Sequence, residues 1–272
     1  MPTALITGAS RGVGAQIARA LAPTHDLLLG GRGSAELDAL AMEFDGAVTL
    51  PVDITDYEAL ETAVETIDSL DVLVHSAGVS SSLEAVADTP VEEWRQVMDV
   101  NVIAAAELTR LLLPALRATA GHVVFLNSGA GMNVRANWTP YAASKFALRA
   151  LADGIRAEEP TLRVTSIFPG RIDTDMQRAI VAEEGDEYRP ERFQGPALWL
   201  KCALAGVLPE VPRGETPPVL YLPGVSRADL RAIESCPRHL QPLAELPYRG
   251  AWFSQINGKD WTLNAFLGSK YG

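Results

Sequence analysis

The sequence predicts an α/β protein built on one doubly wound parallel sheet, with helices on both faces in a three-layer αβα arrangement. Two alternating patterns carry this prediction. Short apolar runs with few charges are typical of strands buried on both faces. Between them lie longer stretches with apolar residues at every third or fourth position, which indicates amphipathic helices. Strand and helix in alternation require parallel strands joined by right-handed crossovers.

The individual elements follow in chain order. We expect strands at Ala4–Thr7, Asp26–Leu29, Val48–Val52, Val72–His75, His122–Asn127 and Arg163–Phe168. We expect helices at Gly12–Leu21, Ala35–Phe44, Tyr57–Ser69, Val91–Leu116 and Pro140–Glu158. The carboxyl ends of the strands meet at one edge of such a sheet, where proteins of this architecture bind their ligands.

Composition excludes several classes of protein. The chain has 272 residues, of which 47% are hydrophobic, and this is enough for an ordinary core. A net charge of −11 argues against nucleic-acid binding. The two cysteines are too few for a disulfide framework or an all-thiolate zinc site, so we expect no metal. Without a basic leader or a run of roughly 18 apolar residues, we expect a cytoplasmic protein that does not bind membranes.

The first predicted strand ends in a glycine-rich turn, TGASRGVG at Thr7–Gly14, that opens the first helix. Gly8 permits a tight turn, Gly12 lets the backbone approach a pyrophosphate, and Gly14 allows close packing of helix on strand. The N–H groups at the start of the helix attract an anion. The turn predicts a dinucleotide site, and a glycine-rich loop without a ligand is the alternative for a single motif.

Two arginines lie at positions expected to determine whether the site accepts a ribose with a 2′-hydroxyl or one with a 2′-phosphate. The second strand leads into Arg32 without a carboxylate, and Arg11 lies in the glycine turn itself. Guanidinium groups bind a 2′-phosphate, so the pair predicts NADP in preference to NAD, with two solvated arginines as the alternative. Asp53, after the third strand, is a candidate acceptor for the adenine amino group and fits a turn cap equally well.

Tyr141 and Lys145 are the strongest candidates for chemistry. We expect Thr139 to cap a helix that begins at Pro140, so that the two side chains project from one face. A phenol has an ordinary pKa of about 10, and an adjacent ammonium lowers that pKa toward the working range. On its own, a YxxxK pair usually marks an exposed helical face.

Two polar residues accompany this pair. Ser128 follows the fifth predicted strand at the ligand edge, where its hydroxyl is placed to bond the oxygen of a carbonyl substrate. Asn101 lies inside a long amphipathic helix, where asparagine is unfavourable and needs a reason. Its side chain is a candidate to hold a water molecule.

Together these residues resemble the short-chain dehydrogenase/reductase family. The motifs, in the family's order, are TGASRGVG at Thr7–Gly14, Asp53, HSAG at His75–Gly78, Asn101, Ser128, YAASK at Tyr141–Lys145 and PGRIDTDM at Pro169–Met176. The resemblance implies a Rossmann-like fold and an NAD(P)-dependent enzyme that interconverts a small-molecule carbonyl and a secondary alcohol. In the implied tetrad, Tyr141 is the acid or base and Ser128 polarises the carbonyl. Lys145 would bind the nicotinamide ribose, and Asn101 would hold a relay water.

The motifs also define the residues expected to bind the cofactor. They are Gly8, Ser10, Arg11, Gly12, Val13, Gly14, Arg32, Asp53, Ala77, Gly78, Tyr141, Lys145, Pro169, Gly170 and Thr174. Where the family usually has two asparagines, this chain has His75 and Ser76, and we interpret His75 as a neutral, buried residue. Family members often pair through helices such as Val91–Leu116, so the resemblance allows for a homo-oligomer.

A second interpretation keeps the nucleotide site without catalysis. In it, the chain is a nucleotide-binding or scaffold protein whose tail blocks the crevice or engages a partner. Turnover of a carbonyl substrate would favour the enzyme over this scaffold interpretation.

The tail differs from the rest of the chain, because proline becomes frequent from Pro190 onward. We expect a catalytic domain at 1–190 and an atypical segment at 191–272. Within that segment, 195–224 would supply the last helix and strand, and 225–272 an extension. The stretch Val219–Trp261 resembles part of PglZ-type phage-defence proteins, but it contains no cluster of metal ligands, so no phosphatase activity follows.

Overall fold

A computed structural model describes residues 1–193, 219–222, 252–256 and 259–263. The strands are β1 (Thr3–Ile6), β2 (Asp26–Gly31), β3 (Val48–Pro51), β4 (Val72–His75), β5 (His122–Leu126), β6 (Arg163–Pro169), β7 (Val219–Leu222), β8 (Trp252–Ile256) and β9 (Lys259–Leu263). The helices are α1 (Gly12–Leu21), α2 (Ala35–Ala41), α3 (Tyr57–Val64), α4 (Val91–Met98), α5 (Ala104–Thr119), α6 (Thr139–Glu158) and α7 (Asp175–Glu183).

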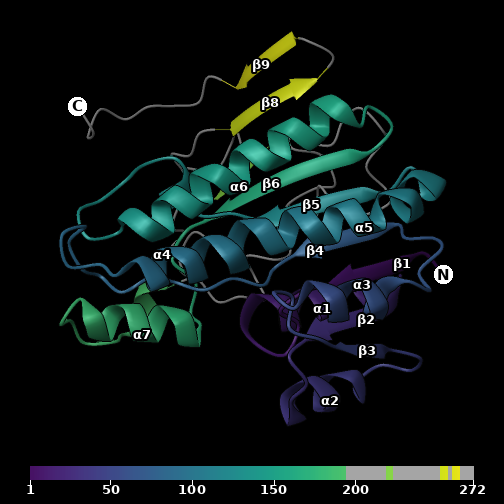
Figure 1. Cartoon of the computed structure of the whole chain (residues 1–272), viewed down its shortest axis with the longest axis horizontal. Helices are drawn as coiled ribbons and strands as arrows, with labels where there is room; N and C mark the ends of the chain where they lie inside the picture. Colours follow the sequence, from purple (N-terminus) through teal and green to yellow (C-terminus); the bar gives the residue numbers. More distant parts are fainter. Residues whose placement is uncertain (194–218, 223–251, 257–258, 264–272) are drawn as a thin grey trace.

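The strands form a single sheet in the order β3-β2-β1-β4-β5-β6-β7-β8-β9 (Figure 1). From β3 to β7 every neighbouring pair is parallel, and β8 and β9 continue the sheet as antiparallel strands. The chain adds strands outward from β1 to β3 and then returns to place β4 on the other side of β1. This reversal is the doubly wound topology, so the predicted fold is confirmed.

Alternate residues of the central strands pack against opposite layers of helices. In β1, Ala4 and Ile6 share a core with residues of α1 and α2, whereas Leu5 packs with residues of α3, α5 and α6. In β5, Val124 and Phe125 divide between the same two cores. Burial on both faces explains why these strands appear in the sequence as apolar runs.

The long helix predicted at Val91–Leu116 is interrupted. α4 ends at Met98, a π-helical turn spans Asp99–Ile103, and α5 continues to Thr119. A π turn adds one residue to a helical turn, so the apolar spacing on either side stays helical. Asn101 lies in this turn, and turns of this kind are frequent at functional sites.

Some helix ends also differ from the prediction. Thr139 does not cap α6 but is its first residue, and Trp138 occupies the cap position without a side-chain bond. α7 was not predicted, although Thr174 accepts a hydrogen bond from the backbone N–H of Gln177 at its start. Thr-x-x-Gln is a recognised start signal for helices, so the sequence did contain an indication of α7.

β7 extends the sheet beside β6, with Ser166 opposite Val219 and Pro169 opposite Leu222. The helix expected within 195–224 lies outside the described residues, as does most of the stretch that resembles PglZ-type proteins. Across the described ranges, every helix is too short or too polar to span a membrane.

Two histidines lie buried in the middle of the sheet. His75 ends β4 and His122 begins β5, and burial lowers the pKa of each to about 3. Nε2 of His75 lies 2.9 Å from Oγ1 of Thr109, and Nε2 of His122 lies 2.9 Å from Oγ1 of Thr165. Both imidazoles are therefore neutral in the folded protein at ordinary pH.

We expect these histidines to make the protein sensitive to acid. An unfolded histidine takes up a proton below a pH of about 6.5, whereas the folded ones do not until about 3, so stability falls as the pH drops through this window. Urea unfolding of the wild type and of His122→Gln, at pH values from about 4 to about 7, measures the effect. The variant should show a shallower loss of stability, and an equal slope in both proteins would contradict the assignment.

Candidate active site

The glycine turn after β1 is packed against the end of β4. Oγ1 of Thr7 accepts hydrogen bonds from the backbone N–H groups of Ser76 and Ala77, each at 3.1 Å. Gly8 has a φ of +63°, and a Cβ there would lie 2.8 Å from Cα of Ala77. A Cβ at Gly14 would lie 2.2 Å from the carbonyl oxygen of Gly8. Side chains are therefore excluded at both glycines.

The start of α1 is suited to an anion. Arg11 occupies the cap position with an extended backbone, and its side chain makes no capping bond. The N–H groups of Gly12 and Val13 in the first turn thus depend on another acceptor, and they lie at the positive end of the helix dipole. A Cβ at Gly12 would meet only Thr174, at 3.6 Å, so the turn is open on its outer side. These features, with the half-buried Ser10 beside them, fit the diphosphate of a dinucleotide.

Two of the residues predicted to bind the adenosine half of the cofactor, Arg11 and Asp53, already have protein partners. Nη1 of Arg11 lies 4.0 Å from Oδ2 of Asp175. Asp53 accepts bonds from the backbone N–H and the hydroxyl of Thr55, at 3.0 and 2.7 Å, and these bonds lower the pKa of Asp53. Asp53 therefore caps the turn that follows β3. Arg32 is exposed just after β2, and its charge adds to the lowered pKa of Asp53.

Tyr141 and Lys145 lie on the buried side of α6. Nζ of Lys145 is 5.7 Å from the centre of the Tyr141 ring and donates to the carbonyl oxygen of Leu126 at 3.0 Å. Burial lowers the pKa of Lys145 to about 8. Burial raises the pKa of Tyr141, and a hydrogen bond with Ser128 opposes that shift. We expected the ammonium to lower the pKa of the phenol, but desolvation prevails in this state.

Ser128 joins this pair from the end of β5. Its Oγ accepts a bond from the backbone N–H of Ala130 at 3.2 Å, and its own hydrogen is donated toward Tyr141, since the bond between the two hydroxyls lowers the pKa of the phenol. Asn127 holds it in place: Oδ1 of Asn127 accepts from the N–H of Ser128, and Nδ2 donates to the carbonyl of Lys145. We did not predict a role for Asn127, although a polar residue at the end of a buried strand was a signal.

Asn101 connects two further segments to the site. Its Nδ2 donates to the carbonyl of Val79 at 2.9 Å and to Oγ of Ser144 at 3.0 Å, and its Oδ1 accepts from the N–H of Val79 at 2.8 Å. Ser144 in turn donates to the carbonyl of Tyr141 at 2.7 Å. Both amide hydrogens are engaged, so a water would find only Oδ1 available. The linking role of Ser144 was not predicted either.

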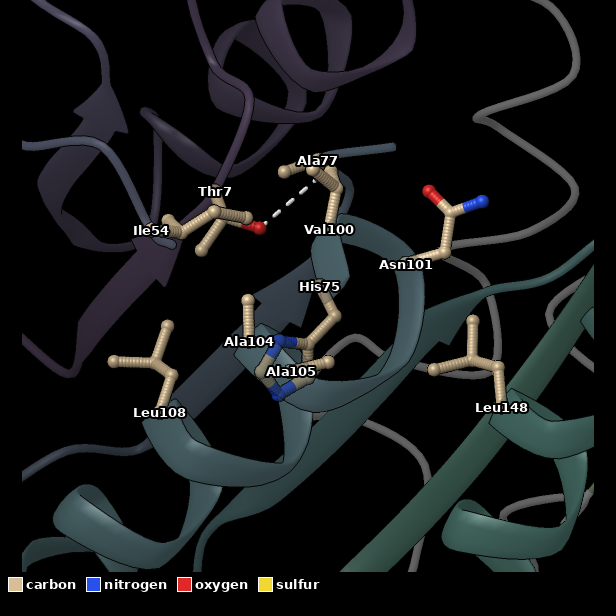
Figure 2. A pocket seen from close by; sticks show the side chains of 10 residues that line it. All are labelled: Thr7, Ile54, His75, Ala77, Val100, Asn101, Ala104, Ala105, Leu108 and Leu148. Carbon is tan, nitrogen blue, oxygen red and sulfur yellow. Dashed lines mark hydrogen bonds between the residues drawn. The ribbon is translucent and has the colours of Figure 1, made fainter. Parts of the chain in front are cut away.

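A small cavity lies behind Asn101 (Figure 2). Its volume of about 10 Å³ matches roughly one water molecule. The lining comprises Thr7, Ile54, His75, Ala77, Val100, Asn101, Ala104, Ala105, Leu108 and Leu148. The ring of His75 is buried and stacks on Phe125, with ring centres 4.7 Å apart. His75 is thus a buried, neutral residue, as we interpreted it.

The remaining predicted cofactor residues lie at the same edge of the sheet. A Cβ at Gly78 would be 3.2 Å from Oδ1 of Asn101 and 3.8 Å from Nζ of Lys145, so this loop passes close to both. Pro169 ends β6 and leads through Gly170 to Thr174, which caps α7. The structure therefore brings the tetrad and the glycine turn together at the edge formed by the carboxyl ends of the strands.

A sequence profile for short chain dehydrogenases matches residues 2–185, which is more than half of the chain. The chain belongs to the short-chain dehydrogenase family. Its relatives carry oxidoreductase names, and this short-chain dehydrogenase is an oxidoreductase of that family, whose members bind nicotinamide cofactors.

Individual relatives resemble most of the described chain. An uncharacterized oxidoreductase of Schizosaccharomyces pombe is 32% identical over 187 residues, which are 67% of this chain and 76% of that protein. Benzil reductase ((S)-benzoin forming) of Saccharomyces cerevisiae is 35% identical over 193 residues, 65% of this chain and 73% of that protein. A short chain dehydrogenase from Shigella flexneri complexed with NADP has a TM-score of 0.74 and 28% identity, covering 81% of this chain and 95% of that one.

The profile stops at residue 185 and so gives no support to the resemblance between Val219–Trp261 and PglZ-type proteins. That resemblance stays a prediction.

Two helical glycines provide a matched test of the glycine turn. Gly14→Ala must displace the carbonyl of Gly8, so we expect a loss of about 1–3 kcal/mol in the free energy of unfolding and weaker binding of NADPH. Gly154→Ala in α6 meets nothing within 4 Å and should stabilise the protein by about 0.5–1 kcal/mol with unchanged binding. Urea unfolding and nicotinamide fluorescence measure both effects. Similar behaviour of the two variants would contradict the packing described.

Proposed function

We propose that this short-chain dehydrogenase is an NADP-preferring enzyme that interconverts a carbonyl and a secondary alcohol, with Tyr141 as acid and base. The observation that carries the proposal is the meeting of the Tyr141 and Ser128 hydroxyls beside the buried ammonium of Lys145. These groups lie at the edge of the sheet that also holds the glycine turn. A carbonyl substrate bound there would have Tyr141 as a proton donor and Ser128 as a hydrogen-bond donor at its oxygen.

Each side chain has a defined task in carbonyl reduction. A bound nicotinamide cofactor would supply hydride chemistry at this site, and the side chains described here handle the proton and the charge. Tyr141 transfers its proton to the carbonyl oxygen, and Ser128 turns its hydroxyl hydrogen from Tyr141 to that oxygen while negative charge develops. In alcohol oxidation the same groups act in reverse, and Tyr141 receives the proton.

Lys145 supports this step in two ways. One of its three hydrogens is held by Leu126, which leaves two for the hydroxyls of a ribose. When Tyr141 gives up its proton, the nearby ammonium stabilises the phenolate, and this effect is larger in a buried site than in water. Asn101 positions α6 through Ser144, and we keep a relay water at its Oδ1 as part of the proposal.

The preference for NADP rests on charge. Arg32 directly follows β2, Arg11 lies in the glycine turn, and the end of β2 carries no acid at the position that would bind a 2′-hydroxyl. The structural neighbour from Shigella flexneri is described as complexed with NADP, which agrees with this proposal. Binding of NAD is the alternative.

We also propose that 1–190 acts as the catalytic domain and that copies of the chain pair through α4 and α5. Val91 at the start of α4 and Ile103 before α5 each expose a large apolar side chain that such a contact would cover.

Two substitutions separate catalysis from binding. Tyr141→Phe should bind NADPH like the wild type but lose about 10²–10⁴-fold in turnover, because the proton donor is removed. Lys145→Ala should lose turnover and also bind NADPH more weakly. Nicotinamide fluorescence gives the binding, and NADPH consumption with a panel of aldehydes and ketones gives the turnover.

Three outcomes would contradict the proposal. A wild-type protein that does not bind NADPH at high micromolar concentration has no such site. Equal turnover in the wild type and Tyr141→Phe would remove the phenol from the reaction. Binding without turnover over the whole panel would favour the scaffold interpretation.

A further inference from the structure

Arg11 has a carboxylate partner on a distant helix. Nη1 of Arg11 lies 4.0 Å from Oδ2 of Asp175, the first residue of α7. Both side chains are largely exposed, at 70% and 69% of their full areas. The pair thus joins the glycine turn to the segment after β6, and both partners are accessible to a ligand.

Thr174, the residue before Asp175, keeps the charges of Asp175 and Arg11 near each other. Thr174 caps α7 with its hydroxyl, while its methyl group Cγ2 lies 3.6 Å from the place that a Cβ of Gly12 would take. The start of α7 therefore lies close to the glycine turn, with room for little more than a methyl group between Gly12 and Thr174. Asp175 also lies at the helix start, where a carboxylate is favourable.

A second acid, Glu36 in α2, is close enough to Arg11 for their charges to interact. The pKa of Glu36 in α2 is lowered by bonds from its own backbone N–H and from Ser34, and to a smaller extent by the charge of Arg11. Arg11 therefore interacts with an acid on α2 and with another on α7. A cofactor phosphate at Arg11 would compete with them.

We propose that Asp175 is a specificity-determining residue for the cofactor, because it competes with the 2′-phosphate of NADP for Arg11. The inference rests on the proposed function, in which Arg11 binds that phosphate. NADH carries no 2′-phosphate, so only NADPH must draw Arg11 away from Asp175. Asp175 thereby reduces the preference for NADPH over NADH.

The test measures binding of both cofactors to the full chain. Dissociation constants for NADPH and NADH are determined by nicotinamide fluorescence for the wild type, Asp175→Asn, Arg11→Ala and the double variant. Asp175→Asn should bind NADPH about two- to fivefold more tightly relative to NADH, the size expected for an exposed ion pair. The gain should shrink at high salt, which screens exposed charges.

Two comparisons isolate the effect of Arg11. In the Arg11→Ala background, Asp175→Asn should no longer change the ratio of the two constants. Asp173→Asn removes the same charge from the same segment, but Asp173 bonds Arg178 and Tyr188 instead of Arg11. This control should leave the ratio unchanged.

The outcomes distinguish this inference from the proposed function. If Arg11→Ala weakens NADPH and NADH equally, Arg11 does not bind the 2′-phosphate, and both its part in the proposed preference and its competition with Asp175 fail. If Arg11→Ala weakens NADPH alone but Asp175→Asn shifts both cofactors equally, the preference stands and the role of Asp175 is overturned. A shift that persists without Arg11, or that Asp173→Asn reproduces, would also overturn it.

Discussion

One buried amide joins three parts of this short-chain dehydrogenase that are distant in sequence. Asn101, only 2% exposed, belongs to the π turn, bonds Val79 in the loop after β4 and donates to Ser144 on α6. Ser144 is bonded to the carbonyl of Tyr141, so the position of the phenol depends on all three segments. A buried amide left without partners costs about 1–3 kcal/mol per group, which disfavours any arrangement with α6 displaced.

The same packing sets the protonation of the site before a cofactor binds. Lys145 is 5% exposed, and desolvation lowers its pKa only to about 8, so most molecules carry the ammonium at neutral pH. The raised pKa of Tyr141 keeps its proton in place. In the folded protein, protonated Tyr141 therefore lies next to the ammonium of Lys145. Among the residues that the structure describes, no buried carboxylate is present to pair with this ammonium. The ammonium therefore compensates the negative charge of the phenolate at the moment when Tyr141 gives up its proton.

The sequence allowed the sheet and the glycine turn to be predicted because the constraints on both leave a direct pattern of residue types along the chain. Residues such as Leu5 and Ile6 must be apolar to be buried on opposite faces, and the close approach of Ala77 leaves no room for a side chain at Gly8. The π turn at Asp99–Ile103 was not predictable from periodicity, since Asn101 fixes it through bonds to remote segments. The direction of the pKa shift of Tyr141 depends likewise on burial, which no short motif reveals.

Helices cover both faces of the sheet over β1 to β6, but its β3 side ends in a strand that pairs only with β2 in the described part of the chain. An unpaired strand offers its N–H and C=O groups to strands of other molecules. Here β3 has four residues and ends in Pro51, which has no N–H to donate. So short and interrupted a row of groups is a poor template for another strand, which protects the folded protein from edge-to-edge aggregation at this side.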